Sequence, residues 1–445
     1  MTTTSADVVI CGVGLAGAAA AYHLTVTQGV RNLLIVDPRP PLSLTSNSST
    51  ECYRNWWPGP GDAMVGLMNR SIDLLEAIAR STDNRIQLNR RGYLFATGEQ
   101  AKVAQFIAAA HESSTLGAGP TRVHTGAADD PPYVPARAAG WEDMPAGADV
   151  IVDPQLIQRY FPFLTAATVA VLHARRCGWL NAQQLGSYLL EQALAHGARL
   201  AQATVGAVDT TGGAVRGVAL VGGEAHAVAT ECFINAAGPG FKAVGALLGL
   251  DLPVFSELHM RVAFDDHAGA IPQHAPLVIW MDETQLAGDE SGERFPAGVH
   301  LRPSGADAHP AALGLWTIDT TPRVPVFPVD LDQRHGELTL RALTTVIPSL
   351  RAILDHGPRI HVDGGYYTKT AENRPLIGPT PIAGAYLMGA LSGFGVMGCC
   401  GFGELLAAHV THSALPPYAP AFLLGRYDDL AYQILLGSWG SSGQL

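Results

Sequence analysis

The chain has 445 residues with 28 Lys and Arg against 39 Asp and Glu, a formal net charge of −11, and 47% of its residues are hydrophobic. At ~150 residues per domain, this length predicts two or three domains or one interleaved architecture. The apolar fraction excludes general disorder, and the acidic balance argues against a nucleic-acid partner, which would require a basic field. The six cysteines lack C-x-x-C spacing, so we expect free thiols in a reducing compartment, with neither a disulfide framework nor a metal site.

The apolar N-terminal run 7–24 has the length of a signal peptide or a membrane anchor. It has no basic segment before it, and it contains three glycines at set intervals and a histidine, which argue against both. No other segment offers the ~18 uninterrupted apolar residues of a membrane span. We therefore expect a soluble cytoplasmic protein without a membrane span.

The first forty residues carry the pattern of a dinucleotide site. The apolar run Asp7–Cys11 predicts a buried parallel strand, and it leads directly into Gly12-Val-Gly14-Leu-Ala-Gly17. An alanine-rich helix is predicted over 18–26 and a second strand over 33–36, and Asp37 ends that strand. Strand, glycine motif, helix, second strand and acidic residue therefore stand in the order that a dinucleotide-binding unit requires.

Each residue of this pattern has a physical task. Gly12 permits the tight turn, Gly14 lets a pyrophosphate approach the backbone, and Gly17 allows the helix to pack closely on the strand. The helix N-terminus offers N–H donors to the pyrophosphate, and Asp37 would accept hydrogen bonds from the ribose hydroxyls. The motif predicts a dinucleotide, but by itself it does not distinguish NAD from FAD.

The rest of the chain alternates helical and strand-like segments before it changes to a strand-rich section. Helices are predicted over 61–80, 182–196, 337–347 and near 401–409, from apolar residues at helical spacing. Strands are predicted over 91–96, 199–208, 215–221, 231–235, 259–264, 277–280, 299–302 and 313–316. The Gly-, Pro- and Asp-rich stretch 117–147 predicts a long loop.

Four blocks in fixed order carry a resemblance to a known family. They are the N-terminal block that ends at Asp37, the loop Ser46–Arg54, the run Phe233-Ile-Asn-Ala-Ala-Gly238, and Asn373-Arg-Pro-Leu-Ile-Gly378 followed by Gly389-Ala-Leu-Ser-Gly-Phe-Gly395. With these blocks, which span nearly the whole chain, the protein resembles the FAD-dependent D-amino acid oxidase superfamily. The likeness is to its branch of glycine oxidase, sarcosine oxidase and dimethylglycine dehydrogenase.

The resemblance implies an α/β fold in which a Rossmann-type FAD-binding domain is interleaved with an α+β substrate domain built on a mostly antiparallel sheet. The FAD-binding domain would comprise residues 1–84, 176–250 and 360–430. The substrate-binding domain would comprise residues 85–175 and 251–359, and residues 431–445 would form a C-terminal tail.

The resemblance also implies FAD as a non-covalent cofactor, because Gly365 stands where sarcosine oxidase has the cysteine that binds its flavin covalently. The helix after Gly393-Phe-Gly395 would place its N-terminus where it could stabilise negative charge on the reduced flavin. The expected cofactor-binding residues are Gly12, Gly14, Gly17, Asp37, Ser46, Ser49, Thr50, Val205, Ala237, Gly238, Gly393, Phe394 and Gly395.

In such an enzyme the protein positions a substrate C–H bond over flavin N5, and the cofactor takes the hydride. Arg54 matches an arginine that helps sarcosine oxidase to hold the substrate carboxylate, with an ion pair to a neighbouring acidic residue as the alternative. Two other carboxylate anchors of the family are replaced here, by Met397 and Tyr367, which argues against a simple amino-acid substrate. The expected catalytic residues are, in this order, Arg54, Tyr367, His259, Lys369 and Arg302, each with a scaffold role as its alternative.

The resulting hypothesis is an FAD-dependent oxidoreductase that takes a hydride from a C–N bond of a primary or secondary amine, giving an imine and reduced FAD. The substrate would be a small amine, an amino acid or an N-substituted amino-acid derivative. Dioxygen or another electron acceptor would reoxidise the flavin, and the sequence leaves the oligomeric state open. The alternatives are an FAD-dependent hydroxy-acid oxidase or dehydrogenase and a flavoprotein subunit of a heteromeric dehydrogenase.

Overall fold

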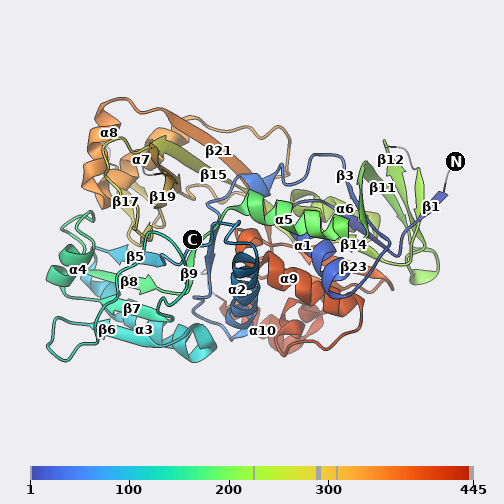
Figure 1. The fold of residues 1–445 in the computed structure, drawn as a ribbon, viewed down its shortest axis with the longest axis horizontal. Helices are drawn as coiled ribbons and strands as arrows, with labels where there is room; N and C mark the ends of the chain where they lie inside the picture. The colour runs from blue at the N-terminus through green and yellow to red at the C-terminus, as the bar shows by residue number, and fades with distance from the viewer. Residues whose placement is uncertain (1–2, 224–225, 287–291, 307–308, 440–445) are drawn as a thin grey trace.

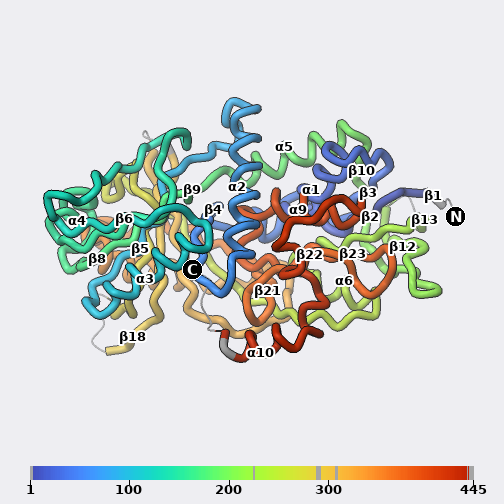
Figure 2. Tube along the Cα trace, turned by 90° about the horizontal axis from the view of Figure 1, so that it is seen from below, coloured from blue at the N-terminus to red at the C-terminus, as the bar shows by residue number. Residues whose placement is uncertain are grey.

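The structure is a computed structural model that describes residues 3–223, 226–286, 292–306 and 309–439. Its elements gather around two large sheets, which lie on either side of helix α2 (Ala63–Ser81) in Figure 1. The view from below shows the same separation (Figure 2). One sheet is mainly parallel and the other mainly antiparallel, which confirms the predicted fold class.

The first sheet has six strands, of which five run parallel. Apart from the more exposed edge strand at 198–202, the parallel strands are short, mainly apolar runs, because both faces of the sheet are covered there. In spatial order the strands are β10 (Ala198–Gln202), β3 (Leu33–Asp37), β2 (Val8–Cys11), β14 (Phe233–Asn235), β23 (Ala385–Gly389) and the antiparallel β22 (Leu376–Pro379).

Alternate residues of β2 and β3 face two different layers. Ile10 and Ile35 pack against helices on one face, whereas Val9 and Val36 pack against a smaller sheet on the other. The helical layer consists of α1 (Leu15–Tyr22), which continues as the π-helix η1 (His23–Thr27), together with α2, α5 (Ala182–Ala195) and α9 (Gly395–Val410). The first sheet is therefore the middle layer of three.

The smaller sheet has four strands in the order β1 (Thr3–Ser5), β13 (Ala227–Ala229), β12 (Gly217–Val221) and β11 (Thr204–Asp209). It corrects one prediction, because residues 199–208 form two strands in two sheets and not a single strand. The partner strand β3 ends at Asp37, and Pro38 follows it, so β10 has no further backbone to pair with beyond Gln202. After Ala203, the chain turns into the small sheet and buries Val205 there.

The second large sheet has nine strands, and its two faces carry different helices. Helices α4 (Pro154–Tyr160), α7 (Arg334–Val346) and α8 (Arg351–Asp355) cover one face, and α3 (Val103–Ser113) packs on the other. In spatial order its strands are β21 (Ile360–Lys369), β15 (Phe255–Asp265), β20 (His309–Leu315), β19 (His300–Ala306), β16 (Leu277–Trp280), β5 (Tyr93–Thr97), β8 (Ala170–Ala174), β7 (Ala148–Ile151) and β6 (Thr121–His124). The last of these lies inside the stretch 117–147, for which the sequence predicted a loop.

Shorter elements connect these layers. Two small ribbons are present: β4 (Cys52–Arg54) pairs with β9 (Cys177–Trp179), and β17 (Thr284–Gln285) pairs with β18 (Arg294–Phe295). The remaining α-helices are α6 (Phe241–Leu247) and α10 (Leu430–Ser438). The single turns are η2 (Thr45–Asn47), η3 (Gln100–Lys102), η4 (Ser114–Ala118), η5 (Thr211–Gly213), η6 (Gly238–Gly240), η7 (Pro348–Leu350), η8 (Ala419–Phe422) and η9 (Leu424–Asp428).

The division of the chain into two interleaved domains stays a prediction. The stretch 85–175 contributes β5 to β8 to the nine-stranded sheet, and the stretch 251–359 contributes β15, β16, β19 and β20. Strand β21 falls in the predicted FAD-binding piece 360–430, yet it pairs with β15 from Ile360 to Lys369. Among the described residues, no helix combines the length and the apolar character that crossing a bilayer requires.

We expect Gly17→Ala to destabilise the fold. A Cβ at Gly17 would overlap the carbonyl oxygen of Gly12, so α1 would have to move away from β2. Overpacking of this kind typically costs about 1–3 kcal/mol, which urea unfolding would detect. Gly437→Ala in α10 is the matched control, because a Cβ there meets no atom within 4 Å. Equal stability of the two variants would contradict the close packing of α1.

Candidate active site

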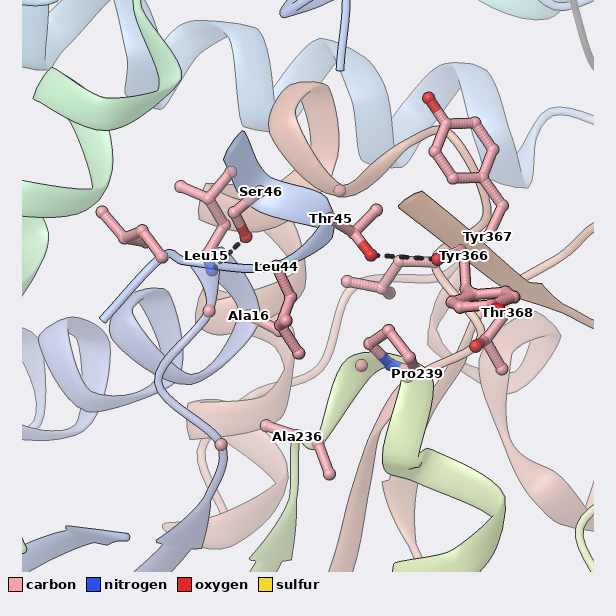
Figure 3. A pocket seen from close by; sticks show the side chains of 18 of the residues that line it. Leu15, Ala16, Leu44, Thr45, Ser46, Ala236, Pro239, Tyr366, Tyr367 and Thr368 are labelled. Atoms are coloured by element: carbon pink, nitrogen blue, oxygen red, sulfur yellow. Dashed lines mark hydrogen bonds between the residues drawn. The ribbon is translucent and has the colours of Figure 1, made fainter. Parts of the chain in front are cut away.

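A cleft that encloses about 900 Å³ lies where the carboxyl ends of β2, β3 and β14 meet the nine-stranded sheet. Ligands of open α/β sheets bind at such strand ends. Figure 3 shows that the walls come from α1, the turn η2, the segment after β14 and strand β21. Of the residues predicted to bind the cofactor, those that line this cleft are Gly12, Gly14, Asp37, Ser46, Ser49, Ala237, Gly238, Gly393 and Gly395.

The first wall is the turn between β2 and α1. Gly12 has a φ of +110°, and a Cβ there would overlap the carbonyl oxygen of Ala236. Gly14 immediately precedes α1, and Leu15 and Ala16 of its first turn line the cleft (Figure 3). The first amides of a helix have no intrahelical acceptor and lie at the positive end of its dipole. This wall is therefore suited to an anion such as a pyrophosphate.

The second wall is formed by Asp37 at the end of β3. Its carboxylate accepts hydrogen bonds from the backbone N–H groups of Val13 (3.0 Å) and Arg39 (2.9 Å). These bonds hold the carboxylate beside a hollow that adjoins the cleft and that Val205 and Ala237 line. An ionised carboxylate has about four lone-pair sites, so it can accept further hydrogen bonds from hydroxyl groups.

The loop 45–51 crosses from the six-stranded to the nine-stranded sheet. Ser46 Oγ accepts a hydrogen bond from the backbone N–H of Leu15 (3.1 Å), while Thr45 Oγ1 donates to the carbonyl of Tyr366 (3.0 Å). Both bonds are drawn in Figure 3. Ser49 Oγ accepts from the N–H of Glu51 (3.1 Å) and closes the end of the loop. The loop is thereby attached to α1 on one side and to β21 on the other.

Arg261 of β15 holds the middle of this loop. Its guanidinium donates to the carbonyls of Asn47 (2.9 Å) and Ser49 (2.6 Å). Asp363 on the neighbouring strand β21 pairs with the same guanidinium at 2.6 Å. The planar fork of arginine suits such divided contacts, so this side chain orients two backbone groups of the loop at once.

Arg302 of β19 holds the end of the loop. It donates to the carbonyl of Thr50 (2.7 Å) and pairs with the carboxylate of Glu51 (2.9 Å), and its side chain is 4% exposed. Glu51 has a φ of +60°, a region that non-glycine residues rarely occupy. A residue remains in this conformation only where its surroundings hold it there. In the structure, Arg302 of β19 thus holds the end of this loop.

The third wall is the turn between β23 and α9. Ala390 and Ser392 have φ values of +54° and +49°, so the backbone is strained twice within three residues. Among the described residues, the buried Oγ of Ser392 has no hydrogen-bond partner, although Ser392 lines the cleft. A Cβ at Gly393 would lie 2.9 Å from the ring of Tyr367. Helix α9 then begins at Gly395, and its first amides open onto the cleft.

A second cavity, of about 530 Å³, adjoins the cleft at Ser49, Tyr367, Gly393 and Val396. Its floor is one face of the nine-stranded sheet, because alternate residues of a strand point to the same side. Across neighbouring strands the floor residues are Tyr367 (β21), His259 (β15), Leu315 and the following Thr317 (β20), His300 (β19), Leu277 and Ile279 (β16) and Tyr93 (β5). The floor is therefore polar at its β21 end and mainly apolar towards β16.

His300 presents a neutral imidazole to this cavity. Its Nδ1 lies 2.8 Å from the carbonyl oxygen of Gly298, which can only accept, so Nδ1 carries the proton. Burial and, to a smaller extent, the nearby charge of Arg54 lower the pKa of His300 to about 4. The second ring nitrogen, Nε2, is then a hydrogen-bond acceptor at neutral pH.

His259 lies at the polar end and belongs to a chain of buried polar groups. Its ring stacks on that of Tyr367 with centroids 4.2 Å apart and an interplanar angle of 14°. Nδ1 lies 3.0 Å from Thr317 Oγ1, and Nε2 lies 3.1 Å from Glu257 Oε2. The ammonium of Lys369 pairs with the same carboxylate oxygen at 2.7 Å. Burial lowers the pKa of His259, while the hydrogen bond to Glu257 partly opposes this shift.

Several predicted site residues lie outside the linings of both cavities. Arg54 is buried on β4 with its guanidinium 4.3 Å above the ring of Trp57, and burial lowers its pKa. Phe394 packs edge-on against the same ring at 4.6 Å. Gly17 lies against the backbone of Gly12, and Lys369 and Arg302 bind the carboxylates described above. The remaining predicted residues do line a cavity. Val205 lines the hollow beside the cleft, and Thr50, His259 and Tyr367 line the second cavity.

Sequence reasoning missed three residues of the second cavity and its surroundings. His300 stands two residues before Arg302, so the period of two on a predicted strand could have placed both on one face. Thr317 follows its strand, and Glu257 precedes the predicted start of its own, so no local pattern marks them. Their roles depend on how β15, β20 and β21 pair.

We expect stability to fall as the pH drops from about 6.5 to about 4. Burial lowers the pKa of His300 to about 4 in the folded protein. Between this value and about 6.5, His300 is therefore protonated in the unfolded chain but neutral in the folded chain. At about pH 5 the difference for this one residue is about 2 kcal/mol. His300→Gln should remove that part of the pH dependence in urea unfolding at about pH 7 and about pH 5. The exposed His111→Gln is the control, and an unchanged dependence in His300→Gln would refute the neutral imidazole.

No group of three or more His, Cys, Asp or Glu side chains in the described ranges could hold a metal ion. Comparison with known proteins finds a curated relative that matches most of the chain. Dimethylglycine dehydrogenase, mitochondrial, from Mus musculus is 24% identical over 423 residues, which cover 93% of this chain and 43% of that protein. The chain thus spans less than half the length of this curated relative.

Solved structures show the same fold. The crystal structure of L-proline dehydrogenase from P. horikoshii matches with a TM-score of 0.74 and 17% identity, covering 96% of this chain and 99% of that one. Glycine oxidase from Geobacillus kaustophilus matches with a TM-score of 0.73 and 17% identity, covering 95% and 99%. A family model described as FAD dependent oxidoreductase (DAO) matches residues 7–409. The chain therefore belongs to the DAO family of FAD dependent oxidoreductases.

Proposed function

We propose that this enzyme oxidises the C–N bond of a primary or secondary amine to an imine in the second cavity. The observation that carries the proposal is the polar part of the cavity floor. His259 stacks on Tyr367, which lines both the cleft and the cavity, Thr317 is hydrogen-bonded to His259, and His300 lies further across the floor on β19. A neutral imidazole nitrogen and a hydroxyl oxygen accept hydrogen bonds from the N–H groups of an amine. The bound FAD supplies a hydride acceptor, flavin N5.

The residues of the cleft fit FAD. The first turn of α1 would hold the pyrophosphate, Asp37 the ribose hydroxyls, and the hollow beside Val205 the adenine. The buried Oγ of Ser392 would gain a partner on the flavin ring, and the amides of α9 would face negative charge there. We expect the cofactor to be held without a covalent bond, since glycine occupies position 365.

The cavity supports a substrate that does not depend on a carboxylate clamp. Among the described residues that line it, none is Arg or Lys. The nearest cations of the sheet bind carboxylates of the protein, since Arg302 pairs with Glu51, Arg261 with Asp363 and Lys369 with Glu257. The apolar end of the floor, with Leu277 and Ile279, would take a hydrocarbon substituent of the amine. An amino-acid derivative would then be recognised mainly through its nitrogen and its apolar part.

Anaerobic titration of the FAD-loaded enzyme tests the reaction class. We expect N-methylated apolar amines to bleach the visible flavin band, and we expect them to do so faster than the matching N-methyl amino acids. A 2-hydroxy acid of similar shape is the comparison, because it offers a C–O bond in place of the C–N bond. Bleaching by the hydroxy acid but by no amine would overturn the proposal. Hydrogen peroxide release in air then distinguishes dioxygen from another acceptor.

We expect Arg302→Met to weaken FAD binding at least about tenfold, which corresponds to about 1.4 kcal/mol. The substitution removes the bonds to Glu51 and to the Thr50 carbonyl, so the end of the loop loses its anchor on the nine-stranded sheet, while Arg261 still holds its middle. Fluorescence of released FAD after ultrafiltration measures the dissociation constant. Arg70→Met is the matched control, since it breaks a 2.6 Å pair with Glu404 at the surface. Equal FAD retention in both variants would show that the loop does not need this anchor.

A further inference from the structure

The polar chain that begins at Thr317 has a defined direction. A carboxylate can only accept hydrogen bonds, so Glu257 accepts from both the ammonium of Lys369 and the Nε2–H of His259. With its proton on Nε2, the neutral ring of His259 accepts at Nδ1, and Thr317 therefore donates its O–H there. The lone pairs of Thr317 Oγ1 remain for a group in the second cavity, which this residue lines.

We propose that Thr317, His259 and Glu257 form a proton-transfer chain that removes a proton from the nitrogen of the bound amine. The inference rests on the proposed function, and it extends that function to the step before C–N oxidation. A protonated amine has its nitrogen lone pair in an N–H bond, so it cannot form the C=N bond of an imine. An amine that arrives as an ammonium ion must therefore lose one proton before the hydride can leave its carbon.

The proton balance of this step is simple. The N–H bond of the ammonium breaks as its proton passes to Thr317 Oγ1. At the same time the original O–H bond of Thr317 breaks, and the hydroxyl proton passes to His259 Nδ1. Thr317 is again a neutral hydroxyl afterwards, and His259 is an imidazolium beside the Glu257 carboxylate. No electrons are transferred in this step, and one positive charge moves from the cavity into the buried chain.

The Glu257 carboxylate favours a proton on His259 and opposes burial and the Lys369 charge, which lower the pKa of this histidine. The side chains of His259 and Glu257 are 1% and 4% exposed, and that of Lys369 is 13% exposed, so the chain leads from the cavity towards the surface. Hydrogen bonds from His259 and Lys369 hold the pKa of Glu257 below its usual value against the effect of burial. The carboxylate is thus ionised and can stabilise the imidazolium, which makes Glu257 and Lys369 positioning residues.

Other titratable groups share the cavity with His259. They are Tyr367, stacked on its ring, His300 across the floor, and Glu51, Cys52 and Tyr93 elsewhere in the lining. Burial raises the pKa of Tyr367 to about 12, so its phenol stays protonated at neutral pH. His300 has an acceptor nitrogen, but burial lowers its pKa to about 4, and its ring donates to a backbone carbonyl rather than to a carboxylate. His259 is therefore the imidazole that is hydrogen-bonded to a carboxylate, that of Glu257, which would balance the positive charge of a gained proton.

The first test is the rate of anaerobic flavin reduction by a saturating apolar amine, measured by stopped flow from about pH 6 to about pH 10. Thr317→Val keeps the shape of the side chain and removes the hydroxyl. We expect it to slow reduction about 100-fold near neutral pH, with recovery at alkaline pH where the free amine binds directly. Thr317→Ser should retain the wild-type profile, because it keeps the hydroxyl.

Thr339→Val is the matched control, since Thr339 is fully buried in α7 and its Oγ1 has no hydrogen-bond partner among the described residues. If Thr317→Val and Thr339→Val had identical pH profiles, the proton-transfer chain would be refuted, whereas the proposed function would be unaffected. A wild-type flavin that no amine reduces at any pH would overturn the proposed function together with the chain. Glu257→Gln should shift the profile to higher pH without a matching rise in KM.

The second test does not depend on turnover. The ¹⁵N NMR signals of the histidine rings, assigned with His259→Gln, report which nitrogen carries the proton in the substrate-free holoenzyme. We expect His259 to be the neutral Nε2–H form near pH 7 in wild type and to lose this preference in Glu257→Gln. A proton on Nδ1 in the wild-type enzyme would contradict the direction of the chain.

Discussion

The structure depends on the attachment of one short loop to two sheets. Residues 45–51 touch the first turn of α1 through Ser46 and strand β21 through Thr45. Two arginines of the nine-stranded sheet bind carbonyls further along the loop, at residues 47, 49 and 50. Arg261 and Arg302 are themselves held by Asp363 and Glu51. Because the cleft and the second cavity share Ser49 from this loop, its position decides how the two spaces meet.

The two cavities are built by different means. The cleft is formed by backbone groups at strand ends and helix N-termini, where glycines allow a large ligand to approach. The second cavity is formed by side chains that repeat every two residues on neighbouring strands, so its chemistry varies across the sheet from Tyr367 at one edge to Tyr93 at the other. This difference explains how one family fold can bind one cofactor and serve different substrates.

The cleft is lined by short runs of residues that are close in sequence, whereas the second cavity is lined mainly by residues that are far apart in sequence. Gly12, Gly14 and Asp37 lie within one strand–helix–strand unit, so local order was sufficient to place them along the cleft. Arg302 was among the expected catalytic residues, and its bond to Glu51 joins residues more than 200 positions apart, so no local pattern indicates it. Thr317 and His259 meet only because β15 pairs with β20, and pairing of that kind has no local signal. The fold class was predictable because its motifs are local, whereas the cavity floor depends on strand register.

The strained turn between β23 and α9 limits how this enzyme could change. Ala390 and Ser392 stay in left-handed conformations only while the surrounding walls hold them, and the same turn brings Gly393 against Tyr367. A lengthened or shortened turn would relieve the strain and displace the helix N-terminus that borders both cavities. New substrates would therefore be reached by exchanging single side chains on the sheet floor, and insertions would be tolerated only in loops remote from this turn.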